Sequence, residues 1–222
     1  MPDPRTEAVE NNARWCDVVV RALGGETAWA ADHWSSRRRS PDGYPDAVTL
    51  SPGATPAAVL AGVTGGAGCS VKDSYADLDL FDSGFRVLFD ATWIRYRAPA
   101  AGRATVLPWR EVADAADLAV WSRGHDLDVF VPALLEQQDL RFCHAPAAGA
   151  GFALLRTGSV VGISNTVPGL ADAGLVWSDL VTVAARAYPG LDLVGYESDA
   201  DLDAALSAGF TATGPLRVWM CG

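Results

Sequence analysis

The chain ends in a run that reads Leu191-Asp-Leu-Val-Gly-Tyr-Glu-Ser-Asp-Ala-Asp-Leu-Asp-Ala-Ala-Leu-Ser-Ala-Gly-Phe-Thr-Ala-Thr-Gly-Pro-Leu-Arg-Val-Trp219. Its first part, residues 191–196, is apolar and looks buried, and residues 201–208 are rich in Asp and Ala. Gly209-Phe210 then opens a second strand-like run that extends to Met220. Because Gly commonly ends a helix and apolar or β-branched runs favour strands, this run predicts strand, short helix, strand.

The residues before this run extend the alternation back to about residue 105. Strands are expected at 109–112, 140–145, 151–156 and 160–167, and helices at 115–123, 131–137 and 175–187. The short turns between the three middle strands indicate an antiparallel meander. Residues 105–222 therefore predict an α+β domain with a mixed sheet, in the order strand, two helices, three strands, helix, strand, helix, strand.

The N-terminal residues 1–98 form a second predicted α+β region. We expect a helix over residues 6–23 that ends at Gly24-Gly25, then a polar loop that contains several tryptophans. A strand at 47–50, a helix at 55–63 and two antiparallel strands at 70–80 and 85–94 follow. The segment from Arg97 to Thr105, rich in Pro, Ala, Gly and Arg, is the expected linker between the two regions.

The two regions share a weak internal similarity. Gly84-Phe85 leading to Trp93 resembles Gly209-Phe210 leading to Trp219. We interpret the N-terminal region as a degenerate half-copy of the C-terminal fold, although the strand expected at 70–80 has no counterpart in the second copy.

Composition narrows the classes of partner. The formal net charge is -10 and the sequence pI is about 4.6, so nucleic acid and anionic membranes are repelled at long range. No apolar run approaches the roughly 20 residues that span a bilayer, and the first residues lack a basic segment followed by an apolar one. We expect a cytoplasmic protein without a membrane or nucleic-acid partner. One lysine, Lys72, against 16 arginines is typical of a GC-rich, actinobacterial-type genome.

The cysteines and histidines indicate no metal and no disulfide framework. Cys16, Cys69, Cys143 and Cys221 are scattered, and the three histidines have no metal-ligand spacing. We interpret the cysteines as reduced, mostly buried apolar residues.

The order of elements over residues 105–222 resembles the Gcn5-related N-acetyltransferase (GNAT) family. The resemblance implies a mixed sheet flanked by helices, with a cleft where the fourth and fifth strands diverge. It also implies transfer of an acyl group from acetyl-CoA or another acyl-thioester to an amine of a small molecule or peptide. The alternative is a non-catalytic or repurposed module that binds a small ligand or a partner protein, and the oligomeric state stays open.

Two family motifs are degenerate in this chain. The glycine-rich turn that holds the coenzyme A pyrophosphate corresponds to residues 168–177, where Asp172 is acidic and no basic residue occurs between Arg156 and Arg186. A gap-free count back from Gly209 places Ala205 at the family's general-acid Tyr and Ser198 at its Asn. The resemblance therefore predicts weaker binding of coenzyme A than is usual in the family.

The candidate site residues follow from this resemblance and from polar residues in apolar strands. Glu197 is the candidate general base on the amine, and the alternative is a charge that starts a helix. The remaining candidates are Asn165, Thr166, Val167, Gly169 and Ser198 for the cofactor, and Tyr196, Trp177 and Trp15 for the substrate. Thr166 and the neighbouring Ser164 could instead face solvent, and Trp15 could pack the first helix on the sheet.

One further pair of charges invites a catalytic interpretation. Lys72 and Asp73 are adjacent in a strand-like segment. The competing interpretation is an exposed charge pair on the edge of a sheet, which limits pairing with other strands.

Overall fold

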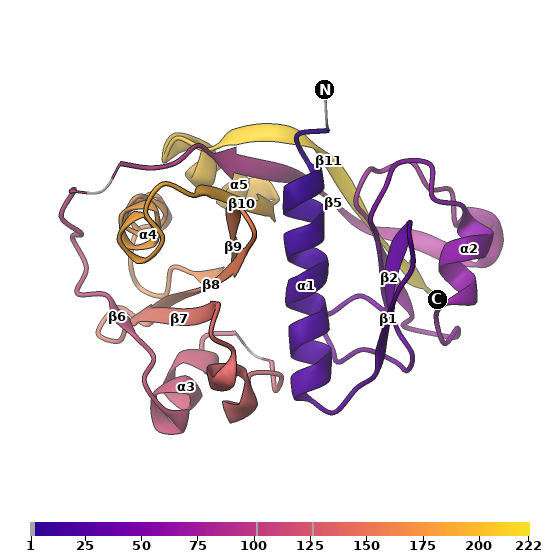
Figure 1. Cartoon of the computed structure of the whole chain (residues 1–222), viewed down its shortest axis with the longest axis horizontal. Helices are drawn as coiled ribbons and strands as arrows, with labels where there is room; N and C mark the ends of the chain where they lie inside the picture. Colours follow the sequence, from indigo (N-terminus) through magenta and orange to yellow (C-terminus); the bar gives the residue numbers. More distant parts are fainter. Residues whose placement is uncertain (1–2, 101, 126) are drawn as a thin grey trace. The chain divides into compact units, whose positions relative to one another are not determined.

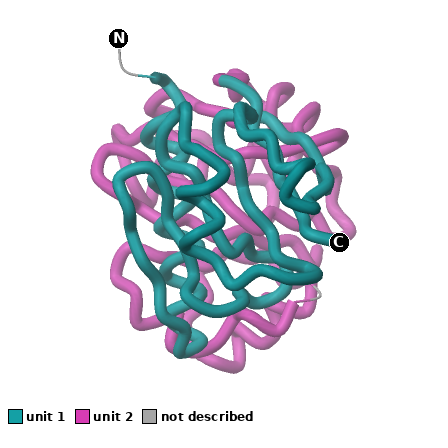
Figure 2. Tube along the Cα trace, turned by 90° about the vertical axis from the view of Figure 1, so that its right-hand side faces the viewer, with its two compact units in different colours: residues 1–92, 214–222 teal, residues 93–213 magenta. Residues whose placement is uncertain are grey.

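The computed structural model describes residues 3–100, 102–125 and 127–222. The chain forms two compact units: unit 1 comprises residues 1–92 and 214–222, and unit 2 comprises residues 93–213 (Figure 2). Two long strands, β5 (Phe85–Tyr96) and β11 (Thr211–Cys221), each contribute residues to both units. The division therefore differs from the expected boundary at residues 98–105, because the chain passes between the units within strands.

Unit 2 contains the strand order that the C-terminal sequence predicts. Its strands are β6 (Arg110–Glu111), β7 (Leu140–Ala145), β8 (Ala150–Thr157), β9 (Val160–Val167) and β10 (Asp192–Glu197), together with parts of β5 and β11. The spatial order is β11-β5-β10-β9-β8-β7-β6. Strands β6 to β9 pair antiparallel, and β9 and β10 pair parallel. This confirms a mixed sheet in which the strand after the meander returns in parallel.

Helices cover both faces of the unit 2 sheet. The helices are α3 (Ala115–Ser122), α4 (Ala173–Ala187) and α5 (Asp199–Ser207), with a 3₁₀ turn at Pro132–Glu136 where a helix was expected. Neighbouring residues of β7 separate the two faces, because successive side chains of a strand point to opposite sides. Phe142 packs on Trp121 of α3, with ring centroids 4.7 Å apart, whereas Cys143 joins the core under α4.

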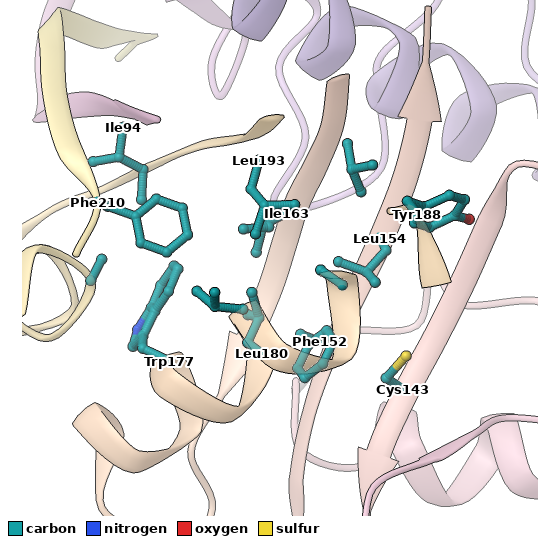
Figure 3. Close-up of a cluster of buried hydrophobic side chains, with 14 residues drawn as sticks. Ile94, Cys143, Phe152, Leu154, Ile163, Trp177, Leu180, Tyr188, Leu193 and Phe210 are labelled. Atoms are coloured by element: carbon teal, nitrogen blue, oxygen red, sulfur yellow. The ribbon is translucent and has the colours of Figure 1, made fainter. Parts of the chain in front are cut away.

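The core of unit 2 lies between the sheet and helices α4 and α5. Figure 3 shows Trp177 and Phe210 close together, with Leu180, Ile163 and Leu193 beside them. The rings of Trp177 and Phe210 meet edge to face at a centroid distance of 5.3 Å. The apolar face of α4 therefore anchors the helix whose N-terminus follows β9.

Unit 1 contains the remaining strands of the same 11-stranded sheet and its own helical segments. They are α1 (Thr6–Ala22), β1 (Thr27–Trp29), β2 (His33–Ser36), β3 (Ala47–Thr49), α2 (Pro56–Ala61), β4 (Ser70–Asp73) and the 3₁₀ turn η1 (Phe81–Ser83). The spatial order is β1-β2-β3-β4-β11-β5. Helix α1 lies beside β1 and β2 (Figure 1).

Strands β1 and β2 correct the expected polar loop. They are held by Asp17 of α1, whose carboxylate accepts hydrogen bonds from Thr27, Trp29 and Trp34 at 2.5, 3.2 and 2.9 Å. Burial alone would raise the pKa of Asp17, but these bonds and Arg21 hold it below its ordinary value. Strand β1 pairs with β2, and β2 pairs with β3. The strands were missed because the segment is polar, and the carboxylate that holds it lies on α1 and is not a local strand signal.

The element order of unit 1 repeats that of unit 2. In each unit an antiparallel meander is followed by a helix, a parallel strand, a short helical segment and a long strand: β1-β2-β3, α2, β4, η1, β5 and β7-β8-β9, α4, β10, α5, β11. Strand β4 is thus the counterpart of β10, which corrects the expectation that the segment at 70–80 has none. Gly84 and Gly209, with φ of 82° and 107°, precede the two long strands, in a region that favours glycine.

The long strands also exchange places between the repeats. In unit 1, β11 lies between β4 and β5, and in unit 2, β5 lies between β10 and β11. Accordingly β5 contributes Phe85 to the core of unit 1 and Ile94 to the core of unit 2. Strand β11 begins after Phe210, which lies in the core of unit 2, and contributes Trp219 to the core of unit 1.

The expected linker is tied to unit 2. The buried carboxylate of Asp179 on α4 accepts hydrogen bonds from the backbone N–H of Val106 and Leu107 and from Trp109 Nε1, at 2.9, 2.8 and 2.9 Å. Nearer its start, Ala98 N–H donates to Asp192 at 2.8 Å. We call residues 102–110 the strap. Composition predicted a linker here and gave no sign of the anchoring, because the carboxylates that hold the segment lie on remote elements.

Candidate functional site

Strands β9 and β10 diverge in unit 2. Their parallel pairing runs from Val160 and Asp192 to Gly162 and Val194. Beyond this point β9 continues to Val167 and β10 to Glu197. Figure 1 shows the two strands side by side. Past the last pair the backbone groups of the two strands are not bonded to each other and can meet a ligand. We take the region between these strand ends as the candidate site and call it the cleft.

A β-bulge bends β9 where the cleft opens. Gly151 and Ala153 of β8 face Val167 and Ser164 of β9, so β9 has one extra residue between these pairs. Within the extra stretch Asn165 has φ of 54°, a left-handed conformation that Asn tolerates better than most residues. The bulge explains the bend, because an unpaired extra residue increases the local twist of a strand.

Glu197 ends β10 on the same side as Leu193 and Gly195, because strand side chains alternate. Burial, with a smaller contribution from the Asp201 carboxylate, raises the pKa of Glu197 to about 8. Among the described residues its carboxylate has no hydrogen-bond or ion-pair partner. A carboxyl group in this state can hold or release a proton close to neutral pH.

The helix that follows β9 begins at Asp172. This residue is the N-cap of α4, and its carboxylate accepts a hydrogen bond from Leu175 N–H at 3.0 Å. Acidic N-caps stabilise helices through such bonds and through the helix dipole. The same carboxylate occupies the end of the helix where a phosphate would otherwise bind.

Two of the expected cofactor residues have mainly structural surroundings. Gly169 has φ of 59°, and a Cβ atom there would lie 2.2 Å from the Ala148 carbonyl oxygen, so only glycine fits against the β7–β8 turn. Ser198 is the N-cap position of α5 but makes no side-chain capping bond.

Thr166 and Val167 lie at the end of β9 as expected. The Thr166 Oγ1 atom is buried and has no hydrogen-bond partner among the described residues. An unsatisfied buried hydroxyl costs about 1–3 kcal/mol, so a ligand that pairs with it would be favoured. Asn165, Thr166, Val167 and Glu197 are therefore brought to one region, the diverging ends of β9 and β10.

The three aromatic candidates have different environments. Tyr196 is half-buried beside Glu197, and its ring meets Trp93 edge to face at 5.5 Å. Trp177 is 1% exposed in the core, where it supports Phe210. Trp15 belongs to unit 1, where it is buried with its ring 6.5 Å from that of Tyr44. Tyr196 is therefore the aromatic candidate that the structure places near the cleft.

Sequence reasoning did not select His125, which follows α3. A Cβ atom at the preceding residue, Gly124, would lie 3.5 Å from Val167 Cγ1, so this loop adjoins the end of β9. The His125 ring stacks on Trp121 at 4.0 Å, and burial lowers the pKa of His125 to about 4. No motif surrounds it, so only the packing of α3 against β7 reveals a neutral imidazole here.

Lys72 and Asp73 are not an exposed pair on a sheet edge. Strand β4 lies between β3 and β11, and both side chains are buried. Lys72 Nζ donates to Asn12 Oδ1 at 2.8 Å, and Asp73 accepts from Leu78 N–H at 2.9 Å. The expectation was wrong because the neighbouring strand β11 comes from the far end of the sequence.

Solved structures resemble this chain along most of its length. A GCN5-related N-acetyltransferase from Kribbella flavida aligns with a TM-score of 0.64 and 12% identity, and the alignment covers 100% of this chain and 96% of the Kribbella chain. A GCN5-related N-acetyltransferase from Sphaerobacter thermophilus has a TM-score of 0.53 and 12% identity, covering 98% and 93%. The chain has a GNAT-like fold.

A third structure with this GNAT-like fold is a functionally unknown conserved protein from Staphylococcus epidermidis. Its TM-score is 0.57 with 9% identity, and 89% of this chain and 94% of the other are covered. No sequence-family model and no curated protein matches the chain. At such identities the similarity establishes the fold, and activity must be argued from the site.

Metal-binding clusters and membrane-spanning helices are both absent from the described residues. These residues contain no group of three or more His, Cys, Asp or Glu side chains arranged to hold a metal ion. In the same part of the chain no helix is long and apolar enough to cross a membrane.

Proposed function

We propose that this protein is an acyltransferase of GNAT type that moves an acyl group from an acyl-CoA or another acyl-thioester to an amine of a small molecule or peptide. The observation that carries the proposal is the half-buried Glu197, whose carboxyl group has a raised pKa, at the end of β10 beyond its last pair with β9. The GNAT-like fold supports the same reaction class. Asn165, Thr166 and Val167 border the opening from the other strand.

The reaction needs one group that removes a proton from the attacking amine. An acyl-thioester supplies an activated acyl carbon and a thiolate leaving group. Glu197 accepts the amine proton directly or through a water, while a C–N bond forms and the C–S bond breaks; the released thiolate takes a proton from solvent. The exposed strand ends and the Thr166 hydroxyl orient the reactants, and positioning alone can supply several powers of ten in rate.

The pyrophosphate of coenzyme A finds poor support in the described residues. Leu175 N–H at the start of α4 is already paired with Asp172, whose negative charge opposes a phosphate. We therefore propose that binding depends mainly on the thioester end of the donor, and that acetyl-CoA binds more weakly than is usual for this fold.

The acidic start of α4 also favours a second candidate function. A chain whose phosphate position carries Asp172, and whose general-acid position carries Ala205, fits a non-catalytic module that binds a small ligand or partner protein. Ala205 is fully buried in the core under α4 and α5, so it takes no part in proton transfer.

The test compares two donors and one variant. Purified protein is incubated with acetyl-CoA or with S-acetyl-pantetheine, which lacks the pyrophosphate, and a panel of amines, and thiol release is followed. We expect transfer from both donors and a rate that rises with pH through about 8, since Glu197 must be ionised to accept a proton. Glu197→Gln should lower the rate by at least about tenfold and remove this pH dependence.

Asp201→Asn is the matched control, because it removes a neighbouring charge without removing the base. By lowering the repulsion it should shift the pH midpoint downward and leave the plateau rate unchanged. Thiol release at the uncatalysed rate for every amine, with neither donor stabilising the protein, would contradict acyl transfer and favour the binding module.

A further inference from the structure

A cavity of about 470 Å³ lies in unit 2 between the strap, β6, β7 and the last turns of α4. Its size falls within the range of about 300–1,000 Å³ typical of small-molecule sites. Val183, Arg186 and Ala187 form its α4 wall. Since a helix rises about 1.5 Å per residue, Val183 is roughly 16 Å along α4 from Asp172, so the cavity is separate from the cleft.

The cavity is positively charged in an acidic protein. Arg110, Arg141 and Arg186 line it, together with a single carboxylate, Glu111. Arg141 Nη1 is 2.6 Å from Glu111 Oε2, and Arg110 is paired with Asp117 outside the cavity at 2.5 Å. Of the three arginines that line the cavity, Arg186 is therefore the one that has no carboxylate partner among the described residues.

Arg186 is held in place but keeps donors available. Its Nη2 atom donates to the carbonyl oxygen of Arg103 in the strap at 2.5 Å, the one hydrogen bond it makes to the described residues. A guanidinium has five N–H donors in a planar fork that matches a carboxylate. Four of these donors therefore remain for a bound anion.

Apart from Thr105, the rest of the lining is apolar or aromatic. Trp109 forms part of the strap wall, where its indole N–H is bound to Asp179 and its ring packs on Phe152 at 4.7 Å. This ring is therefore fixed, and Val183 and Ala187 face the same cavity. A fixed aromatic wall beside one free cation suits a ligand with one anionic group and an apolar body.

We infer that this cavity binds a small organic carboxylate, with its anionic group on Arg186 and its apolar part between Trp109 and α4. The inference does not depend on acyl transfer, because no residue of the β9–β10 cleft lines the cavity. Benzoate is a suitable probe, and benzamide has the same ring and shape without the charge.

The test is a ligand-observed NMR titration of the full chain at constant ionic strength, with probes up to about 10 mM, which covers millimolar affinities. We expect benzoate to bind at least fivefold more tightly than benzamide or inorganic phosphate. Arg186→Gln should weaken benzoate at least fivefold, and Val183→Phe, which fills the cavity, should abolish binding. Arg156→Gln removes an arginine of β8 that pairs with Asp139 outside the cavity, and should change nothing.

Folding of each variant is checked by circular dichroism. Val183→Phe fills the cavity and Arg186→Gln removes the charge, so a failure of one variant to fold leaves the other decisive. Absence of benzoate binding to the wild type would overturn the inference. So would equal binding of benzamide or phosphate, or unchanged binding in whichever cavity variant is folded. Acyl transfer measured on the same samples reports separately on the proposed function.

Discussion

Two acidic residues near the candidate site differ because their surroundings differ. Glu197 has a largely desolvated carboxyl group that finds no partner in the described part of the chain, whereas Asp172 is exposed and caps a helix. The folded chain therefore keeps a proton on Glu197 between its ordinary pKa of 4.5 and about 8, where the unfolded chain has already lost it. Stability therefore falls as the pH rises through this window, because only the unfolded chain releases the proton there, and such a cost is typical of groups at functional sites.

The charge of Asp172 can be removed without removing its capping bond. Asp172→Ser keeps a side-chain oxygen that accepts from Leu175 N–H, so stability should change by less than about 1 kcal/mol. Because the charge opposing a phosphate is lost, we expect coenzyme A to bind about three- to tenfold more tightly by calorimetry.

Asp114→Ser is the control for this substitution. Asp114 is the N-cap of α3 and makes the same type of bonds to Ala116 and Asp117 N–H. Equal tightening in both variants would mean that only the net charge of the protein matters, and unchanged affinity in Asp172→Ser would place the phosphates elsewhere.

At the scale of elements, the strap depends on one carboxylate. Asp179 accepts three N–H groups from Val106, Leu107 and Trp109, and Asn can satisfy fewer of them. Asp179→Asn should therefore destabilise the protein by about 1–3 kcal/mol in urea unfolding. It should also release the strap, so that limited trypsin digestion after Arg103 becomes at least severalfold faster by mass spectrometry.

Asp139→Asn provides a comparison for the strap. Its carboxylate makes an exposed ion pair with Arg156, which contributes about 0–1 kcal/mol in general. Similar losses of stability in the two variants, or an unchanged rate of cleavage after Arg103 in Asp179→Asn, would show that the strap is held by other contacts.

At the scale of the whole molecule, two strands contribute to two cores. Strand β5 places Phe85 and Ile94 in different cores. Strand β11, which begins next to Phe210 in the core of unit 2, places Trp219 in the core of unit 1. Each unit therefore needs part of β5 and part of β11 to complete its strands, and both strands continue into the other unit. We therefore expect the chain to unfold as one cooperative system.

Trp219→Ala tests this coupling, because its 1% exposed side chain packs in unit 1 alone. Loss of a buried Trp costs about 3–5 kcal/mol. Native-state hydrogen exchange should show the opening free energy falling equally in α1 of unit 1 and α4 of unit 2. Leu206→Ala, at an exposed position of α5, should leave both unchanged. Loss of protection in α1 with α4 unaffected would show independent units.

Local sequence patterns were sufficient for most elements of unit 2. Turn residues and apolar runs gave the meander, α4, β10, α5 and β11, because each depends on neighbours within a few residues. The position of Glu197 at the end of β10 followed from the same patterns. In unit 1 the pattern failed at β1 and β2, whose partners include Asp17 of α1.

Tertiary structure alone decided the features that depend on distant partners. The exchange of β5 and β11 joins residues more than 100 positions apart, so no local signal encodes it. The same holds for the burial of Lys72 beside β11, the anchoring of the strap by Asp179, and the raised pKa of Glu197. The sequence by itself determined the order of the elements, because propensity and periodicity are local. The packing of remote segments decided which side chains are desolvated, and hence which pKa values are shifted toward the range useful for catalysis.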